Sequence, residues 1–169
     1  MFILRNIPKY QVLLEQASRY PELDIDVVET CLAFLRTTAN VLEAYEAHFV
    51  RYGLSMGKFS VLMLLEQTCG QGLTPSECAE RAGVTRGTIT GLLDGLERDG
   101  LVKREPHAAD RRMIVIQLTQ KGQQLLTSML PDHFCRTSAL FGSLTAAERQ
   151  TLVKLLNKLQ GKTSVVANP

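Results

Sequence analysis

The stretch 74–118 constrains the fold of this chain most, because a helix-capping signal, a glycine and a second capping signal follow one another there. Thr74, Pro75 and Glu77 have the order of a capping box with proline at the first helical position, which predicts the start of a helix. Gly83 suits the left-handed turn that ends such a helix. We therefore expect a short helix between these two signals.

A second helix is predicted after the turn, with Thr85 as its cap and Gly100 as its end. Apolar residues at helical spacing form its buried stripe, namely Ile89, Leu92, Leu93 and Leu96. Ala79, Gly83 and Ile89 are a small residue, a turn glycine and an apolar residue at the spacing typical of a helix-turn-helix. The two helices are therefore expected to cross closely and to form that motif.

The outward face of the second helix is expected to be poor in large side chains, because it carries Gly87 and Gly91. Each glycine inside a helix costs about 1 kcal/mol relative to alanine, so both need a reason. One interpretation is that they pack against another helix. The other is close approach to DNA, with threonines that bond to base edges or touch thymine methyl groups. This surface would consist of Thr85, Arg86, Gly87, Thr88, Thr90 and Gly91.

A two-stranded hairpin is predicted next, with strands at 101–104 and 113–118 and alternating isoleucines on one face of the second strand. Leu73 is expected to pair briefly with it as a third strand. Arg111 and Arg112 lie where the loop returns to the second strand. Two arginines alone are typical of a solvated surface, but after a helix-turn-helix they favour a loop that enters the minor groove of DNA.

The segment from Leu73 to Leu126 resembles the MarR family of winged-helix transcription regulators. The resemblance rests on the runs LTPSECAERAGVTRGTITGLLDGLERDGLVKR and ADRRMIVIQLTQKGQQLL. It implies that Asp110 steadies the hairpin loop and that a neighbouring arginine enters the minor groove. Arg112 matches that arginine best and Arg111 second. Members of the family often carry larger polar residues at the positions of the two glycines, so this chain has fewer side chains for reading bases.

Further DNA contacts are expected around the motif. Lys103 and Arg104 are candidates for phosphate contacts, and Thr74 and Ser76 lie where a helix N-terminus can meet a phosphate. The competing hypothesis is a winged-helix module that binds proteins and never DNA. Arginines at both the second helix and the loop argue against it.

The flanking segments predict a dimer around this lobe. Residues 24–54 and 120–161 carry long apolar stripes and are expected to be dimerisation helices, with Pro131 kinking or interrupting the second segment. Residues 55–119 form the winged-helix lobe, so the whole chain, 1–169, is interpreted as one mainly α domain with a small β-hairpin. A homodimer implies a pseudo-palindromic double-stranded DNA operator. Residues 1–23 are expected to contain a short helix and to pack across the partner subunit.

A candidate effector pocket lies at the end of the first long helix. Its residues are Tyr45, His48, Phe49, Arg51 and Tyr52. One interpretation makes the aromatic residues core and the charged groups solvated. The other is a mostly apolar pocket in which Arg51 or His48 faces a small anionic aromatic ligand, as the family resemblance implies.

Composition excludes several other classes of protein. The net charge is only +2, so DNA binding would depend on where the bases lie rather than on total charge. No apolar run is long enough for a membrane helix, and the N-terminus is a poor signal peptide, so we expect a cytoplasmic protein. The four cysteines have no zinc spacing, and no cofactor motif or enzymatic constellation is found. Cys31 is the one candidate redox sensor.

Overall fold

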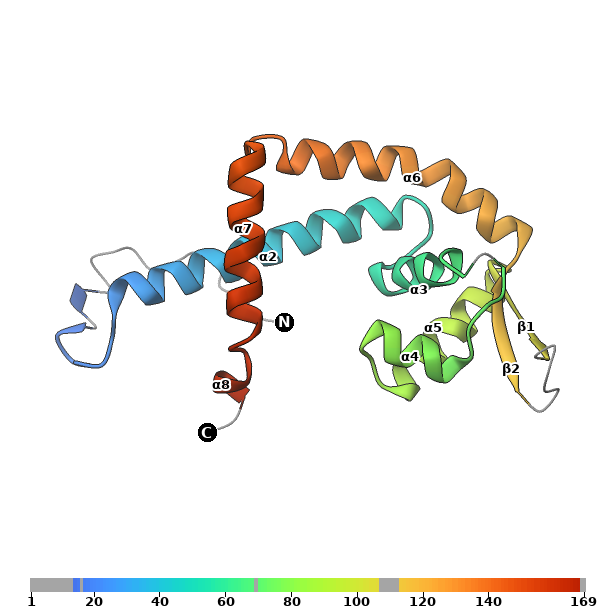
Figure 1. Cartoon of the computed structure of the whole chain (residues 1–169), viewed down its shortest axis with the longest axis horizontal. Coiled ribbons are helices and arrows are strands. Elements are labelled where there is room, and N and C mark those ends of the chain that lie inside the picture. The colour runs from blue at the N-terminus through green and yellow to red at the C-terminus, as the bar shows by residue number, and fades with distance from the viewer. Residues whose placement is uncertain (1–13, 16, 69, 107–112, 168–169) are drawn as a thin grey trace. The chain divides into compact units, whose positions relative to one another are not determined.

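The computed structural model describes residues 14–15, 17–68, 70–106 and 113–167 of the 169-residue chain. Its helices are α2 (Ile25–Val50), α3 (Met56–Glu66), α4 (Pro75–Ala82), α5 (Arg86–Arg98), α6 (Gln120–Phe141), α7 (Ala146–Gln160) and α8 (Ser164–Ala167). The strands β1 (Val102–Pro106) and β2 (Ile114–Leu118) form an antiparallel hairpin (Figure 1). The expected fold class, mainly helical with a small hairpin, is confirmed.

Contacts within the chain divide it into two compact units, residues 1–122 and 123–169. The first unit holds α2 to α5 and the hairpin, and the second holds most of α6 together with α7 and α8. The expectation of a single domain over residues 1–169 stays a prediction.

Local capping explains where α4 and α5 begin. The Thr74 hydroxyl accepts a hydrogen bond from the Glu77 backbone N–H (3.3 Å), and the Glu77 carboxylate accepts one from the Thr74 N–H (2.8 Å). This is the reciprocal capping box that the sequence predicts. Gly83 ends α4 at φ +64°, in the left-handed region, and Thr85 caps α5 by accepting from the Thr88 N–H (3.2 Å).

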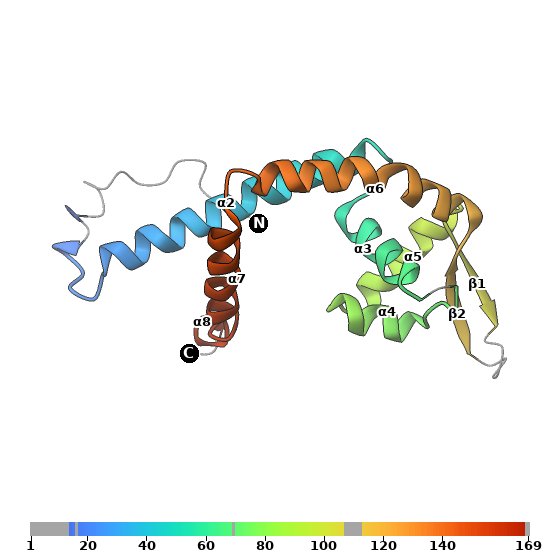
Figure 2. The same cartoon turned by 45° about the horizontal axis from the view of Figure 1, so that its top comes forward.

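The core of the first unit lies where α3, α4, α5 and the hairpin meet, and Figure 2 shows these elements together in a second view. From α5 it takes Ile89, Leu93 and Leu96, each at most 1% exposed, as predicted. Fully burying such a side chain stabilises the fold by about 1.5–3 kcal/mol. Leu92 is only half-buried and lies against Gly57 of α3, where an added Cβ would be 3.1 Å from the Leu92 Cδ2 atom.

Backbone pairing fixes the hairpin against the body of this unit. β1 pairs with β2 in the register Val102↔Leu118, and Leu73 adds the expected bridge to Ile116 on the other edge of β2. Gly72 permits that bridge, because its φ is +77° and an added Cβ would lie 2.5 Å from the Ile116 carbonyl oxygen.

The expected alternation along β2 is wrong in part. Val115 and Ile116 are both buried while Ile114 is exposed, so neighbouring residues are covered on opposite faces of the strand. The reason is that α3 and α4 both contact this short strand, which leaves neither face of its central part open to water.

α2 is a 26-residue helix capped by Asp24, whose carboxylate accepts a hydrogen bond from the Val27 N–H at 3.1 Å. Only His48 and Phe49 of this helix are buried. The exposed apolar side chains along it are Val27, Phe34, Leu42 and Val50. Other apolar residues of the helix, such as Leu32 and Leu35, are half-buried, so α2 keeps apolar surface in contact with water within one chain.

The expectation about Pro131 in α6 is wrong in part. Pro131 was expected to kink or interrupt this helix, and the interruption is wrong, because the helix runs from Gln120 to Phe141 with the proline inside. Proline removes a single backbone donor, and the rest of this 22-residue helix is long enough to continue on both sides.

Thr145 and Glu148 form a capping box at the start of α7, and Gly161 is the cap at its end. Hydrogen bonds from the Thr145 backbone N–H and then its hydroxyl lower the pKa of the Glu148 carboxyl. Every residue of α7 is at least partly exposed, including Val153, Leu155, Leu156 and Leu159. None of the helices in the described part of the chain combines the length and apolarity that a membrane span requires.

Candidate nucleic-acid interface

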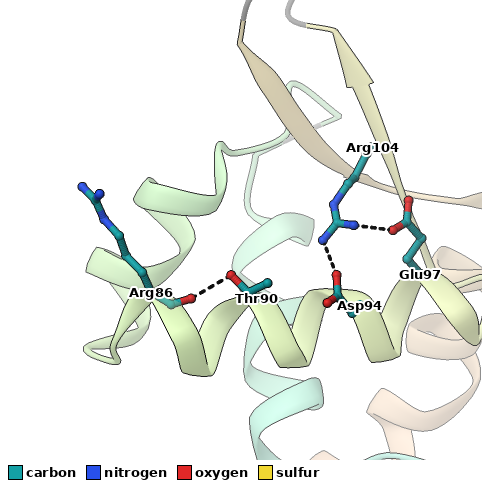
Figure 3. A network of polar contacts seen from close by, with 5 residues as sticks. All are labelled: Arg86, Thr90, Asp94, Glu97 and Arg104. Atoms are coloured by element: carbon teal, nitrogen blue, oxygen red, sulfur yellow. Dashed lines mark hydrogen bonds and ion pairs between the residues drawn. The ribbon is translucent and has the colours of Figure 1, made fainter.

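α5 presents an exposed polar row formed by Arg86, Thr90 and Asp94, which follow one another at intervals of four residues (Figure 3). The Thr90 hydroxyl donates to the Arg86 carbonyl oxygen at 2.8 Å. Because its proton is used within the helix, this hydroxyl can only accept a hydrogen bond from a ligand, and the side chain also offers a methyl group. The Thr88 and Thr85 hydroxyls are likewise bonded to each other, at 2.9 Å.

The two outer glycines of α5 face open space. A Cβ added at Gly91 would meet no atom of the described residues within 4 Å, and one at Gly87 would meet only the Thr85 hydroxyl oxygen, at 3.9 Å. The interpretation that these glycines pack against another helix is therefore wrong for the described part of the chain. Gly95 differs, because a Cβ there would lie 3.0 Å from the Cε atom of Lys58. That lysine reaches Asp99 at the end of α5, with an N···O distance of 2.6 Å.

The guanidinium of Arg104 on β1 is held by two carboxylates of α5. One terminal nitrogen lies 2.6 Å from an Asp94 oxygen, and the other lies 2.7 Å from a Glu97 oxygen (Figure 3). The hydrogen bond that the guanidinium donates to Asp94, followed by attraction to Glu97, raises the pKa of the arginine above its ordinary value. Although Arg104 was expected to contact phosphates, its hydrogen-bonding groups are thus directed at α5.

The other cations of the lobe differ in how they are paired. Lys103 bonds to Glu105 of the same strand, with an N···O distance of 2.6 Å. Among the residues that the structure describes, the side chain of Arg86 has no carboxylate partner, and Figure 3 shows it directed away from the Arg104 cluster. Arg86 is therefore an available cation at the start of α5.

The remaining expected contacts fall at the start of α4 and in the hairpin loop. Ser76 is exposed in the first turn of α4, while the Thr74 hydroxyl also donates to the Glu77 carboxylate at 2.7 Å. Asp110, Arg111 and Arg112 lie outside the described residues. Their assignment stays a prediction.

The candidate effector residues do gather at the end of α2. Phe49 is buried and stacks on Phe59 of α3, with ring centroids 4.3 Å apart. His48 is buried against Tyr52, at 5.4 Å between centroids, and Tyr45 stacks on Phe49 at 6.1 Å. Phe49 thus serves as core, whereas Tyr45 and Tyr52 are half-buried and Arg51 is exposed.

The described cysteines do not form a metal site. Cys31 and Cys135 are exposed, while burial, and then the charge of Glu77, raises the pKa of the Cys78 thiol to about 11. A thiol with such a pKa stays protonated at neutral pH and behaves as a small apolar side chain. Among the described residues, no group of histidine, cysteine and acidic side chains could hold a metal ion.

The role of Asp94 and Glu97 was not predicted from the sequence. The available signal was a pair of acids three residues apart on an exposed helix face, followed by a cation in the next strand. That pattern fits many solvated helices. Only the hairpin register brings Arg104 back over α5, and the register is not a local property.

Two crossed helices, an open glycine and threonine face on the second, and a hairpin directly after it define a winged helix-turn-helix transcription regulator. Residues 54–114 match the model of the MarR family. The chain is 40% identical over 162 residues to the HTH-type transcriptional repressor YetL of Bacillus subtilis, covering 96% of this chain and 97% of that one. With this extent of similarity, the chain belongs to the MarR family.

Solved structures agree on the fold. The Staphylococcus aureus MepR–DNA complex superposes with a TM-score of 0.69 at 21% identity, covering 78% of this chain and 94% of that one. CouR from Rhodococcus jostii, bound to p-coumaroyl-CoA, gives a TM-score of 0.65 at 26% identity, covering 83% of this chain and 92% of that one.

Proposed function

We propose that this chain represses transcription by binding a specific DNA sequence, with the exposed face of α5 in the major groove. The observation that carries this proposal is the open space at Gly87 and Gly91, which nothing in the described part of the chain fills. A helix without side chains at two exposed positions can bring its backbone close to the edges of base pairs in the major groove. The repressor YetL and the MepR–DNA complex support the same function.

The contacts divide into three groups under this proposal. The major groove meets Thr85, Arg86, Gly87, Thr88, Thr90 and Gly91. The minor groove receives Arg112, with Arg111 beside it and Asp110 as support for the loop. Lys103, Thr74 and Ser76 contact phosphates, which position the protein without reading sequence.

We further propose that the protein acts in the cytoplasm as a homodimer. Support comes from the exposed apolar side chains of α2 and α7, such as Phe34, Leu42, Leu155 and Leu159, since a single chain leaves them in water. A two-fold dimer presents two copies of α5, so the operator is a pseudo-palindrome with half-sites roughly one helical turn apart.

The experiment is selection of bound duplexes from a random pool by the purified full-length chain. A pseudo-palindromic consensus is the expected result, and light scattering at micromolar concentration should give the mass of a dimer. No enrichment over the starting pool would reject DNA binding and favour the competing function, a winged-helix module that binds proteins. A monomer in solution would reject the dimer.

Release of the repressor by a small anionic aromatic ligand is the finer proposal. Tyr45 and Tyr52 are half-buried and Arg51 is exposed, so this end of α2 offers aromatic surface and a cation. CouR, with its bound p-coumaroyl-CoA, supports an aromatic ligand of this kind. If the ligand weakens DNA binding tenfold, DNA must weaken ligand binding by the same factor. Calorimetric titration of aromatic carboxylates into free and DNA-bound protein tests this, and equal affinities would reject the coupling for those ligands.

A further inference from the structure

The hairpin is tied to the rest of its unit along both edges. On one edge, the Leu73 N–H donates to the Ile116 carbonyl oxygen (3.1 Å) and the Ile116 N–H donates to the Leu73 carbonyl oxygen (2.7 Å). On the other edge, β1 places Arg104 opposite Ile116, and the arginine side chain reaches Asp94 and Glu97 of α5. The first connection is a backbone bridge next to α4, and the second consists of the two hydrogen bonds from the Arg104 side chain to α5.

The contact of Arg104 with Asp94 and Glu97 has the geometry of a rigid connection. Each terminal nitrogen of the guanidinium donates to a different carboxylate, and the two acids lie three residues apart, on one face of α5 (Figure 3). An arginine fork that bonds at two points fixes both distance and orientation, which the single point charge of a lysine does not. The arginine side chain is 34% exposed, so the pair is partly shielded from water.

The charge of this cluster makes it a poor contact for a phosphate. One arginine and two ionised carboxylates sum to −1, and a phosphate placed beside them would meet net repulsion. Arg86, at the other end of the same row, carries no such acids and remains the cation for DNA.

We propose that Arg104 is a positioning residue, which sets the angle of the hairpin against α5 so that the hairpin loop and α5 engage neighbouring segments of one duplex. This proposal rests on the DNA-binding function proposed above, and it assigns the arginine to geometry instead of to a phosphate contact. Asp94 and Glu97 take part in it as the anchors on α5.

The two roles of Arg104 predict opposite results for one variant. Asp94→Asn with Glu97→Gln raises the charge of the lobe by two and frees the guanidinium. If Arg104 contacts a phosphate, this double variant binds DNA more tightly. If Arg104 positions the hairpin, the same variant binds more weakly despite its extra positive charge, by about tenfold for the loss of two charge-assisted hydrogen bonds.

The test uses a duplex selected from a random pool by the wild-type protein, with affinity measured by fluorescence anisotropy at several salt concentrations. We expect Arg104→Gln and the double variant to lose about tenfold each, and the triple variant to lose no more than either, because they break one connection. The slope of log affinity against log salt should stay at the wild-type value. Lys103→Gln on the same strand is the matched control, since loss of a phosphate contact reduces that slope by about 0.9 and leaves the sequence preference intact.

A second selection, made with Arg104→Gln, separates positioning from a general loss of structure. The variant should keep the base preferences in the part of the site that α5 contacts and lose those in the flanking part that the loop contacts. Thermal unfolding by circular dichroism checks that the variants are folded at the assay temperature. Equal or tighter binding by the double variant, or a uniform loss of preference by Arg104→Gln, would overturn the proposal. If the wild type selects no duplex, it is the proposed function that fails.

Discussion

Replacing Gly91 with alanine should make the protein more stable and a weaker DNA binder. Glycine in an exposed helix interior is about 0.8–1.0 kcal/mol less favourable than alanine. The added Cβ would meet no described atom within 4 Å, so no packing cost offsets this gain. We expect the free energy of unfolding to rise by about 1 kcal/mol and the midpoint of thermal unfolding by about 2–4 °C for a chain of this size.

The same methyl group should hinder DNA binding, because it occupies the space that lets the α5 backbone approach the bases. We expect a loss of about 1–3 kcal/mol in binding free energy, similar to that of one mismatched base pair. Stability is measured by thermal unfolding at one fixed protein concentration, because dimerisation makes the midpoint depend on concentration. Affinity is measured by anisotropy on the selected duplex at one fixed salt concentration.

Gly95→Ala in the same helix is the matched control. Its Cβ would lie 3.0 Å from the Lys58 Cε atom, on the protein side of α5, so we expect a smaller gain in stability and a smaller loss of affinity. A Gly91→Ala protein that is more stable and binds DNA like wild type would refute close approach by this face. A Gly91→Ala protein that is less stable would refute the open space around the glycine.

Four further outcomes are expected. Arg112→Ala should weaken operator binding by about 1–3 kcal/mol and reduce its salt dependence, and an unchanged titration would remove the hairpin loop from the interface. Leu155→Glu, at a side chain 55% exposed in one chain, should shift light scattering from dimer to monomer. The pKa of Glu148 is lowered in the folded state, so the carboxylate stabilises the fold above its unfolded pKa, and this contribution is lost as the pH falls through the folded pKa. In Glu148→Gln, the midpoint of thermal unfolding should therefore fall less steeply as the pH is lowered through this range. Iodoacetamide at pH 8 should alkylate Cys31 in the native protein well before Cys78, whose pKa is about 11, as mass spectrometry can follow.

The sequence predicts the helix-turn-helix well because its signals are local. The capping box at Thr74 and the turn at Gly83 depend on residues within one or two helical turns of each other, so they can be recognised without knowing the rest of the fold. The stripe on α5 is equally local, and three of its four predicted residues are buried. These are the elements whose predicted limits agree with the structure.

What the sequence does not predict depends on contacts between distant segments. The fork of Arg104 requires the hairpin register, and the burial of Val115 requires α3 and α4 to cover both faces of β2. The distinction between Gly95, which accommodates Lys58, and Gly91, which faces open space, also needs the position of α3. From the sequence alone, Arg104 is an ordinary arginine in a strand, Val115 is one residue of an alternating pattern, and Gly91 and Gly95 are two glycines in a helix.

The open face of α5 bears on how this protein could discriminate one DNA sequence from another. Two of the positions that we propose to face the groove have no side chain, and the Thr90 hydroxyl proton is already bonded to the Arg86 carbonyl oxygen. Few donors are therefore left to read base edges, so direct readout by α5 alone would discriminate weakly. The fit of a helix without side chains at these positions depends instead on the width and depth of the groove. A hairpin held at a fixed angle also makes binding sensitive to how the duplex bends between the α5 contact and the hairpin-loop contact. We therefore expect the selected consensus to show preferences at base pairs that no side chain reaches, in the segment between the α5 and loop contacts.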